Sequence, residues 1–305
     1  MRLNLTSIVL LAAIFVFSAC SKDKDEQSSQ KNVNCNDATQ EPALARLEFP
    51  RVKGGNSVVL IHQTGDSWGI NYSVEWDKDK KSQRWSCYQM NRANSVQNTS
   101  RYRSDDNQYP KDPMLPSADY LSQDCFWGSG FDHGHICPSA DRLYSSNANL
   151  QTFYLTNMQP QTKALNGSLS GQENRSPWYR LEGQVRSWAT ASATENLYVV
   201  KGGTIEDNQI LTKDGKPWLL KGEMRIPKYF FVALLLKNEQ GYKAVGFWME
   251  HVDKYDRAIP LADYAVNIRD LEQKTGIDFF CNLPDETEDH VETLPIENVK
   301  RAWGL

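Results

Sequence analysis

The residues best suited to chemistry in this chain lie in one stretch, from Phe131 to Arg142. It contains two of the five histidines, His133 and His135, together with Cys137 and two acids. Side chains alternate between the two faces of an extended strand, so these three side chains are predicted to point the same way. Imidazole transfers protons near neutral pH, and imidazole and thiolate both bind metals. The stretch is therefore predicted to be an active site, a metal-binding site or simply the polar edge of a strand.

The elements that must position this stretch follow from the apolar patterning. Short apolar or alternating runs predict β-strands at residues 58–61, 71–76, 84–90, 151–158, 196–200, 229–236 and 244–249. Apolar residues at helical spacing predict helices at 177–190, with Ser176 as N-cap, and at 262–275, ended by Gly276. Residues 93–124, rich in Asn, Ser, Asp and Pro, are predicted to form a long loop. The predicted fold class is α+β, with a central, mostly antiparallel sheet and flanking helices in one domain at residues 47–305.

The N-terminus has the features of an export signal. A basic residue, an apolar run and the small-residue ending Phe17-Ser18-Ala19-Cys20 predict a signal peptide at residues 1–20. The ending resembles a bacterial lipobox, which implies a lipid anchor at Cys20 on the periplasmic or surface side of a bacterial membrane; a plain secretory signal is the alternative. Residues 21–46 begin with a polar run that cannot bury apolar area, and they are predicted to be a flexible linker.

Charge and cysteine content narrow the class of protein further. The net charge of −4 and pI of about 5.8 exclude a surface coated in basic residues, although local basic patches remain compatible with them. Five cysteines follow Cys20, so at least one stays unpaired if the others form disulfides. Cys125 and Cys137 are a plausible pair by proximity in sequence, and a buried free thiol is an equal alternative for each.

Three ordered segments carry a family resemblance. They are Asp132-His133-Gly134-His135, then residues 154–167 with Asn157, Pro160, Gln161 and Leu165-Asn166-Gly167, then Trp178-Tyr179-Arg180-Leu181-Glu182. Together they resemble the DNA/RNA non-specific endonucleases, the family of Serratia nuclease and mitochondrial endonuclease G. That family has the pattern Asp-Arg-Gly-His, Asn-x-x-Pro-Gln, Leu-Asn-x-Gly and Trp-x-x-Leu-Glu. The resemblance covers most of residues 55–285 and implies a ββα-metal (His-Me finger) nuclease fold.

The resemblance also implies a mechanism and its residues. It implies a sequence-non-specific endonuclease that hydrolyses DNA and RNA, with His135 as the general base that activates water. Asn166 would hold one Mg²⁺, with Mn²⁺ or another divalent cation as the alternative. Asn157 and Glu182 would support the water shell of the metal and position the site. One amide ligand is chemically sufficient, because Mg²⁺ keeps most of its waters in proteins.

The chain departs from the family pattern in the spacing after Asn166. The family reaches its tryptophan sooner, so roughly eight residues, 168–175, are inserted before Trp178. Asn174 preserves the family spacing to Trp178 and is therefore the alternative metal ligand.

A second departure concerns phosphate binding. His133 stands where the family has arginine, and histidine holds phosphate with a full charge only when it is protonated. The substitution predicts activity that is weaker or is favoured at mildly acid pH, and a gain at neutral pH from His133→Arg. The other phosphate-contacting arginine of the family matches Arg103 best, with Arg101 close behind.

Other readings compete with the nuclease interpretation. His133, His135 and Cys137 could be three zinc ligands, although a structural zinc site needs a fourth. A glycan- or peptide-binding module, or a weak or inactive nuclease fold that only binds nucleic acid or another ligand, are the remaining alternatives. The other histidines, His62, His251 and His290, lack a local constellation and are predicted to be structural.

Overall fold

The computed structural model describes residues 31–65, 67–122 and 124–305. The predicted signal peptide, the lipobox-like ending at Cys20 and the first part of the linker lie outside the described residues. Within the described residues, no helix is long and apolar enough to cross a bilayer.

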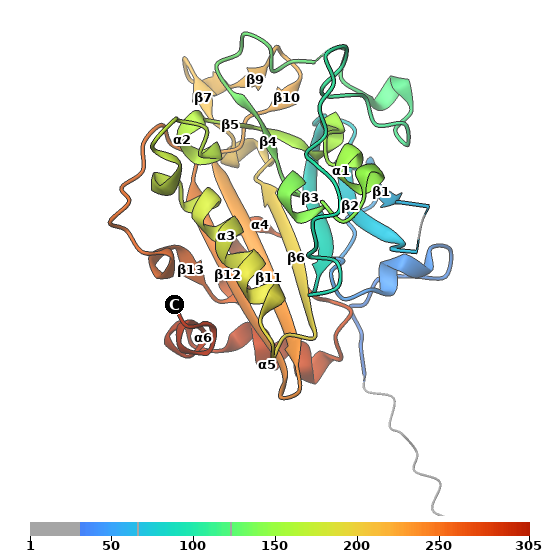
Figure 1. Cartoon of the computed structure of the whole chain (residues 1–305), viewed down its shortest axis with the longest axis vertical. Helices are drawn as coiled ribbons and strands as arrows, with labels where there is room; N and C mark the ends of the chain where they lie inside the picture. Colours follow the sequence, from blue (N-terminus) through green and yellow to red (C-terminus); the bar gives the residue numbers. More distant parts are fainter. Residues whose placement is uncertain (1–30, 66, 123) are drawn as a thin grey trace, which may run out of the picture. The chain divides into compact units, whose positions relative to one another are not determined.

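A seven-stranded sheet forms the centre of the domain (Figure 1). Every pair of neighbouring strands in it is antiparallel. In spatial order its strands are β1 (Ser57–Gln63), β2 (Ile70–Asp77), β3 (Ser82–Met90), β6 (Asn196–Gly203), β11 (Tyr229–Asn238), β12 (Gly241–Glu250) and β13 (Ala265–Val266). The α+β prediction with a central antiparallel sheet is confirmed.

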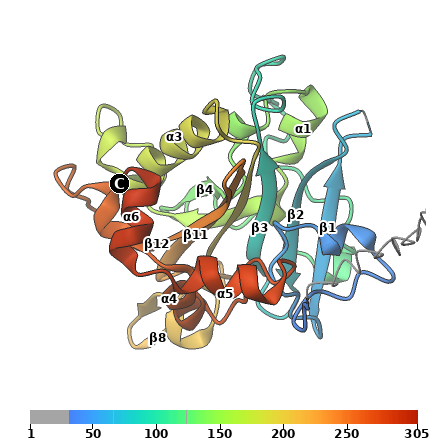
Figure 2. The same ribbon diagram turned by 90° about the horizontal axis from the view of Figure 1, so that it is seen from below.

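Both faces of the central strands of this sheet are buried. Successive side chains of a strand point to opposite sides, so each strand contributes to two cores. In β11, Phe230 and Val232 belong to the core on one face, whereas Phe231 and Ala233 belong to the core on the other. Figure 2 shows the sheet between a layer containing α3 and a layer containing α4 and α5. This arrangement explains why β11 is apolar throughout rather than alternating.

Six α-helices surround the sheet in the described part of the chain. They are α1 (Ser146–Gln151), α2 (Lys163–Asn166), α3 (Pro177–Thr190), α4 (Ile268–Thr275), α5 (Asp285–Thr293) and α6 (Ile296–Trp303). The bounds of α3 match the prediction, and the Ser176 hydroxyl accepts from the Tyr179 backbone N–H at 3.0 Å, as an N-cap should.

Short strands complete the described structure. The paired strands are β4 (Asp132–His135) with β5 (Met158–Gln161), β7 (Thr212–Lys213) with β8 (Lys216–Pro217), and β9 (Leu219–Leu220) with β10 (Met224–Arg225). The pair β4–β5 followed by α2 is the ββα unit implied by the resemblance. Gly134 is required in this pair, because an added Cβ would lie 2.3 Å from the Gln161 side chain.

Two element predictions are wrong in part. The strand predicted at 151–158 is replaced by the end of α1, a 3-10 helix (Leu155–Asn157) and only the first residue of β5. The helix predicted from residue 262 begins at Ile268, because a 3-10 helix (Leu261–Tyr264) and β13 precede it and Asn267 is its N-cap. In both places several short elements and turns follow one another within a single apolar stretch. The spacing of the apolar residues does not show where one element ends and the next begins.

Residues N-terminal to position 47 also contact the domain. Lys31–Leu305 form one compact unit, and residues 32–36 are bonded to its C-terminal part. The Asn32 Nδ2 donates to the Leu283 carbonyl at 2.6 Å, and the Asn34 Nδ2 donates to Glu288 Oε1 at 2.8 Å. Asparagine amides thus anchor a segment that has little apolar area to bury.

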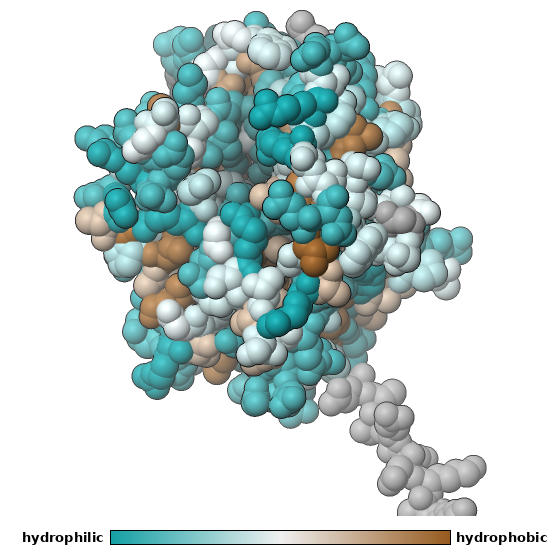
Figure 3. All heavy atoms as spheres, viewed as in Figure 1, coloured by the Kyte–Doolittle hydropathy of each residue, from teal (hydrophilic) through white to brown (hydrophobic). Residues whose placement is uncertain are grey.

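The surface seen in Figure 3 is mostly hydrophilic, with hydrophobic residues in small separate groups.

Candidate active site

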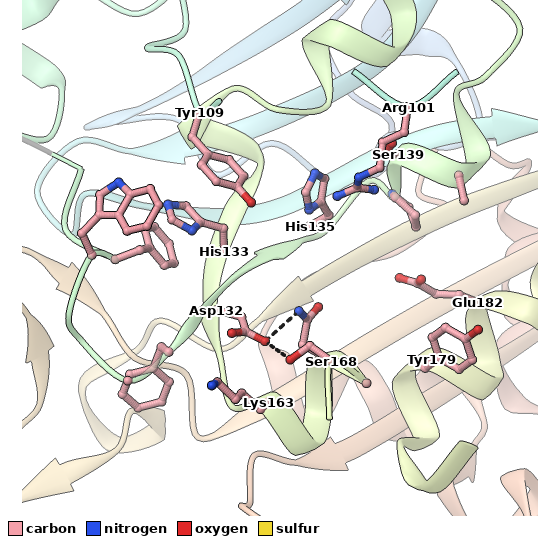
Figure 4. Close-up of a pocket in the computed structure, with 18 of the residues that line it drawn as sticks. Arg101, Tyr109, Asp132, His133, His135, Ser139, Lys163, Ser168, Tyr179 and Glu182 are labelled. Atoms are coloured by element: carbon pink, nitrogen blue, oxygen red, sulfur yellow. Dashed lines mark hydrogen bonds between the residues drawn. The ribbon is translucent and has the colours of Figure 1, made fainter. Parts of the chain in front are cut away.

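A cavity of about 780 Å³ opens where β4, α2 and the N-terminal half of α3 meet. Its lining includes His133, His135, Asn166 and Glu182 together with Arg101, and Figure 4 shows the labelled ones among them around the cavity. Residues more than eighty positions apart in sequence therefore contribute to one site. Three other sequence-predicted residues, Asn157, Arg103 and Asn174, do not line this cavity.

His135 ends β4 with its imidazole in an apolar setting. The ring meets Phe153 edge-on at 4.8 Å between centroids. Its Nε2 is enclosed and has no hydrogen-bond partner among the described residues. Burial and the nearby Arg101 guanidinium lower the pKa of His135 to about 3, against the opposing effect of a hydrogen bond to the backbone of His133. The ring is therefore neutral at physiological pH and retains a nitrogen that can accept a proton.

Asn166, the last residue of α2, is oriented by an acid of the central motif. Its Nδ2 donates to Asp132 Oδ2 at 3.0 Å, and the Ser168 hydroxyl bonds to the same oxygen (Figure 4). With its NH₂ group bound there, the amide presents its oxygen elsewhere. Gly167 then ends the helix with φ of +69°, and an added Cβ would lie 2.9 Å from the Tyr179 Cβ.

The short helix α2 is held in place from outside the motif. The Thr162 hydroxyl caps it by accepting from the Leu165 N–H at 3.2 Å, and it also donates to the Val252 carbonyl at 2.8 Å. The Thr162 N–H donates to His251 Nε2 at 2.8 Å, and burial lowers the pKa of His251 to about 4, which keeps that nitrogen an acceptor. His62 is likewise structural, since its Nε2 bonds to buried Asp112 at 2.8 Å.

Glu182 reaches the cavity from α3 and forms an ion pair with a buried lysine of β6. Its Oε1 accepts from Lys201 Nζ at 2.7 Å. Lys201 projects from β6 with only 3 % of its side chain exposed, and its ammonium lies 4.1 Å from the ring centroid of Trp178. Sequence reasoning missed Lys201 because a lysine inside an apolar strand run carries no motif.

Asn157 contacts the backbone that follows His135 rather than the cavity. It is fully buried, and its amide bonds to both backbone groups of Cys137, at 2.9 Å each, and to the Thr152 carbonyl at 2.8 Å. All of these partners are protein groups, so the amide does not face the cavity. The structure thus makes Asn157 a positioning residue that fixes the chain two residues after His135.

The arginine that lines the cavity is Arg101 rather than Arg103. The guanidinium of Arg101 lies 4.8 Å from the Phe153 ring centroid, and Phe153 also contacts His135. Spacing alone cannot distinguish Arg101 from Arg103, because both lie in a loop without regular structure. The geometry favours Arg101 as the arginine of the site, and a role for Arg103 stays a prediction.

His133 is enclosed rather than free to bind phosphate. Its ring stacks on Tyr109 at 3.6 Å with an interplanar angle of 3°, and on Phe126 at 4.3 Å. Its Nε2 bonds to Asp124 Oδ2 at 2.9 Å. Burial acts to raise the pKa of Asp124, but hydrogen bonds from His133 and from the Phe126 backbone lower it on balance. The structure therefore supports an aromatic stack at this position in place of a phosphate contact.

The structure distinguishes between the remaining alternatives for the metal ligand, the cysteines and a zinc site. Asn174 lines a different cavity, with Arg175 and Arg257, so Asn166 is the asparagine at the site. Cys125 and Cys137 are both buried free thiols, so the suggested disulfide between them is wrong. No group of three or more His, Cys, Asp or Glu side chains in the described ranges is placed to hold a metal, which leaves the zinc reading without support.

Comparison with known proteins identifies the family. A sequence model of the DNA/RNA non-specific endonuclease family matches residues 64–286. The chain belongs to this family. This endonuclease is 27 % identical over 221 residues to Nuclease C1 of Cunninghamella echinulata var. echinulata, covering 71 % of this chain and 83 % of that protein. It is 30 % identical over 161 residues to mitochondrial endonuclease G of Homo sapiens, covering 51 % and 50 % of the two chains.

The fold agrees with that membership. A chain in the crystal structure of the EndoG/EndoGI complex superposes with a TM-score of 0.60 at 18 % identity, covering 75 % of this chain and 89 % of that one. The implied ββα-metal nuclease fold is confirmed, and the protein is a phosphodiester hydrolase of a divalent-metal-dependent family.

The donor set at the site fits a hard divalent cation. Asn166 offers a neutral amide oxygen, oriented by the bond from its NH₂ group to Asp132, and Glu182 adds a carboxylate to the same cavity. Oxygen donors of low charge suit Mg²⁺ or Mn²⁺, which retain waters, better than zinc.

Proposed function

We propose that this endonuclease hydrolyses phosphodiester bonds in DNA and RNA without sequence preference, with one divalent cation, Mg²⁺ or alternatively Mn²⁺, held at Asn166. The observation that carries the proposal is the convergence of His135, Asn166 and Glu182, from β4, α2 and α3, on one cavity. Phosphodiester hydrolysis needs an activated water, neutralisation of phosphate charge and a stabilised leaving oxygen.

His135 takes the proton of the attacking water. The neutral ring is the form that can accept a proton, and Nε2 is the nitrogen without a protein partner. A bound phosphate would offset the positive charge of Arg101, and this would raise the proton affinity of the ring when substrate is present.

Arg101 binds the phosphate and Glu182 orients waters at the cation. A guanidinium pairs well with phosphate oxygens, and Arg101 is the arginine that the loop brings to the cavity. When bound, the cation supplies Lewis-acid stabilisation of negative charge on the phosphate and leaving oxygen. Asp132 and Lys201 hold the side chains of Asn166 and Glu182 in position for it.

The proposal includes export and a lipid anchor at Cys20, supported by the sequence pattern at residues 1–20 alone. Cys20→Ser should move the protein from the membrane fraction to the soluble exported fraction and abolish labelling by a fatty-acid analogue. Labelling that persists in Cys20→Ser would contradict the anchor.

Cleavage of plasmid DNA and of RNA with Mg²⁺, with and without EDTA, tests the reaction. His135→Ala should remove activity, whereas His290→Ala, a change at an exposed histidine on α5, should leave it unchanged. Full activity in His135→Ala would eliminate the assigned base. Absence of metal-dependent cleavage in the wild type would favour the alternative, a weak or inactive nuclease fold that binds nucleic acid.

A further inference from the structure

Two exposed aromatic rings stand at the active-site cavity. Among the described residues, seven large hydrophobic side chains are exposed, and two of these, Trp127 at 68 % and Tyr179 at 43 %, line the cavity that contains His135. Trp127 is the most exposed aromatic of that set. Large apolar surface left open beside a binding site usually marks a contact with a ligand.

Trp127 is held in place although it is exposed. Its ring meets His133 edge-on, at 5.8 Å between centroids and an interplanar angle of 68°. His133 is itself stacked between Tyr109 and Phe126. The ring is therefore supported along part of its edge while most of its surface remains open to solvent.

Tyr179 supplies a ring from a separate element, the first turn of α3. Its Cβ lies close enough to Gly167 that any side chain there would collide with it. The same cavity carries the cations Arg101, Lys163 and Arg186. The site thus combines positive charge for a phosphate backbone with fixed aromatic rings, the composition of surfaces that bind single-stranded nucleic acid.

We infer that Trp127 stacks on an unpaired nucleobase beside the scissile phosphate, with Tyr179 as a second aromatic contact, so that the enzyme cleaves single-stranded DNA and RNA faster than duplex. The inference rests on the proposed function. A base in a duplex is covered on both faces by its neighbours, so only an unpaired base can present a face to the indole. The histidine at position 133 completes the support, because its flat ring fills the space between Tyr109 and Phe126.

The test compares single-stranded and duplex oligonucleotides of one sequence with the wild type, Trp127→Ala and Trp127→Phe. Stacking on one base predicts a fall of about 5- to 150-fold in kcat/KM on the single strand in Trp127→Ala, with a much smaller change on duplex and substantial rescue in Trp127→Phe. Trp68→Ala is the matched control, since Trp68 is also exposed, at 37 %, but does not line the cavity.

A binding experiment separates failure of this inference from failure of the proposed reaction. In full-length His135→Ala, affinity for a dT oligomer should exceed affinity for an abasic oligomer of equal length, and Trp127→Ala should remove that difference. Loss of the difference supports stacking even if no cleavage occurs. An unchanged single-strand to duplex ratio in Trp127→Ala, with unchanged affinity for the dT oligomer, would overturn the inference and assign the ring to a protein partner instead.

Discussion

The ion pair beneath the cavity allows a sharp test of how the site is built. Lys201 is 3 % exposed and Glu182 is 18 % exposed, with 2.7 Å between Nζ and Oε1. The perturbation is to replace each residue with methionine, singly and together. Methionine matches glutamate in length, is one atom shorter than lysine, and adds no polar group beside Trp178 and Val232.

The two single replacements should differ in their effect on the free energy of unfolding. Glu182→Met leaves a buried ammonium without its carboxylate, which costs about 3–5 kcal/mol. Lys201→Met leaves a carboxylate that can turn toward water in the cavity, so the loss should be smaller, about 1–3 kcal/mol. The double variant has no unpaired buried charge and should return to within roughly 1 kcal/mol of the wild type.

Urea denaturation and steady-state cleavage measure the two consequences separately. Lys201→Met should lower kcat more than it raises KM, because Glu182 is still present but no longer held, and the double variant should regain stability without regaining activity. The control is the exposed pair of Lys237 and Glu195, 3.1 Å apart and more than 40 % exposed, whose removal should leave the free energy of unfolding nearly unchanged. The reasoning would be refuted if the stability lost in the double variant equalled the sum of the losses in Glu182→Met and Lys201→Met to within about 0.5 kcal/mol.

Three further changes have defined outcomes. His133→Arg, which the family pattern alone predicts to raise activity at neutral pH, should instead lower Tm and activity because the longer side chain cannot keep the stack on Tyr109; a gain in kcat at pH 7 would restore the phosphate-binding role. Asn157→Ala should cost about 1–3 kcal/mol for each backbone group of Cys137 left unpaired and should reduce kcat, as followed by chemical denaturation and cleavage rates. Glu292 is 1 % exposed, and burial and neighbouring acids raise its pKa to about 9 from 4.5. Between these two pH values the folded state retains a proton that the unfolded state releases. The free energy of unfolding should therefore fall as pH rises from about 4.5 to 9, by at most about 1.4 kcal/mol per pH unit. Glu292→Gln should therefore flatten that slope in denaturation curves between pH 6 and 9 and leave cleavage unchanged, and an unaltered slope would mean that Glu292 is ionised when folded.

Local periodicity predicted the parts of the fold that have a long, regular signal. The helix at 177–190 has an apolar stripe at helical spacing, the strand near 71–76 alternates, and the strands near 196–200 and 229–236 are continuous apolar runs. The structure places all four as predicted. The other elements around the site had no such signal. The strands β4 and β5 and the helix α2 have four residues each, too few for a period to be visible.

The family and the residue types of the site could be predicted from the amino-acid sequence, because the order and spacing of the motifs are visible along the chain. Tertiary packing selects which candidates meet: Arg101 rather than Arg103, and Asn166 rather than Asn174, line the cavity with His135. It also supplied the partners that carry no motif, such as Lys201 beneath Glu182. These contacts join residues far apart in the chain, and their proximity depends on how the sheet and helices pack, which no local pattern records.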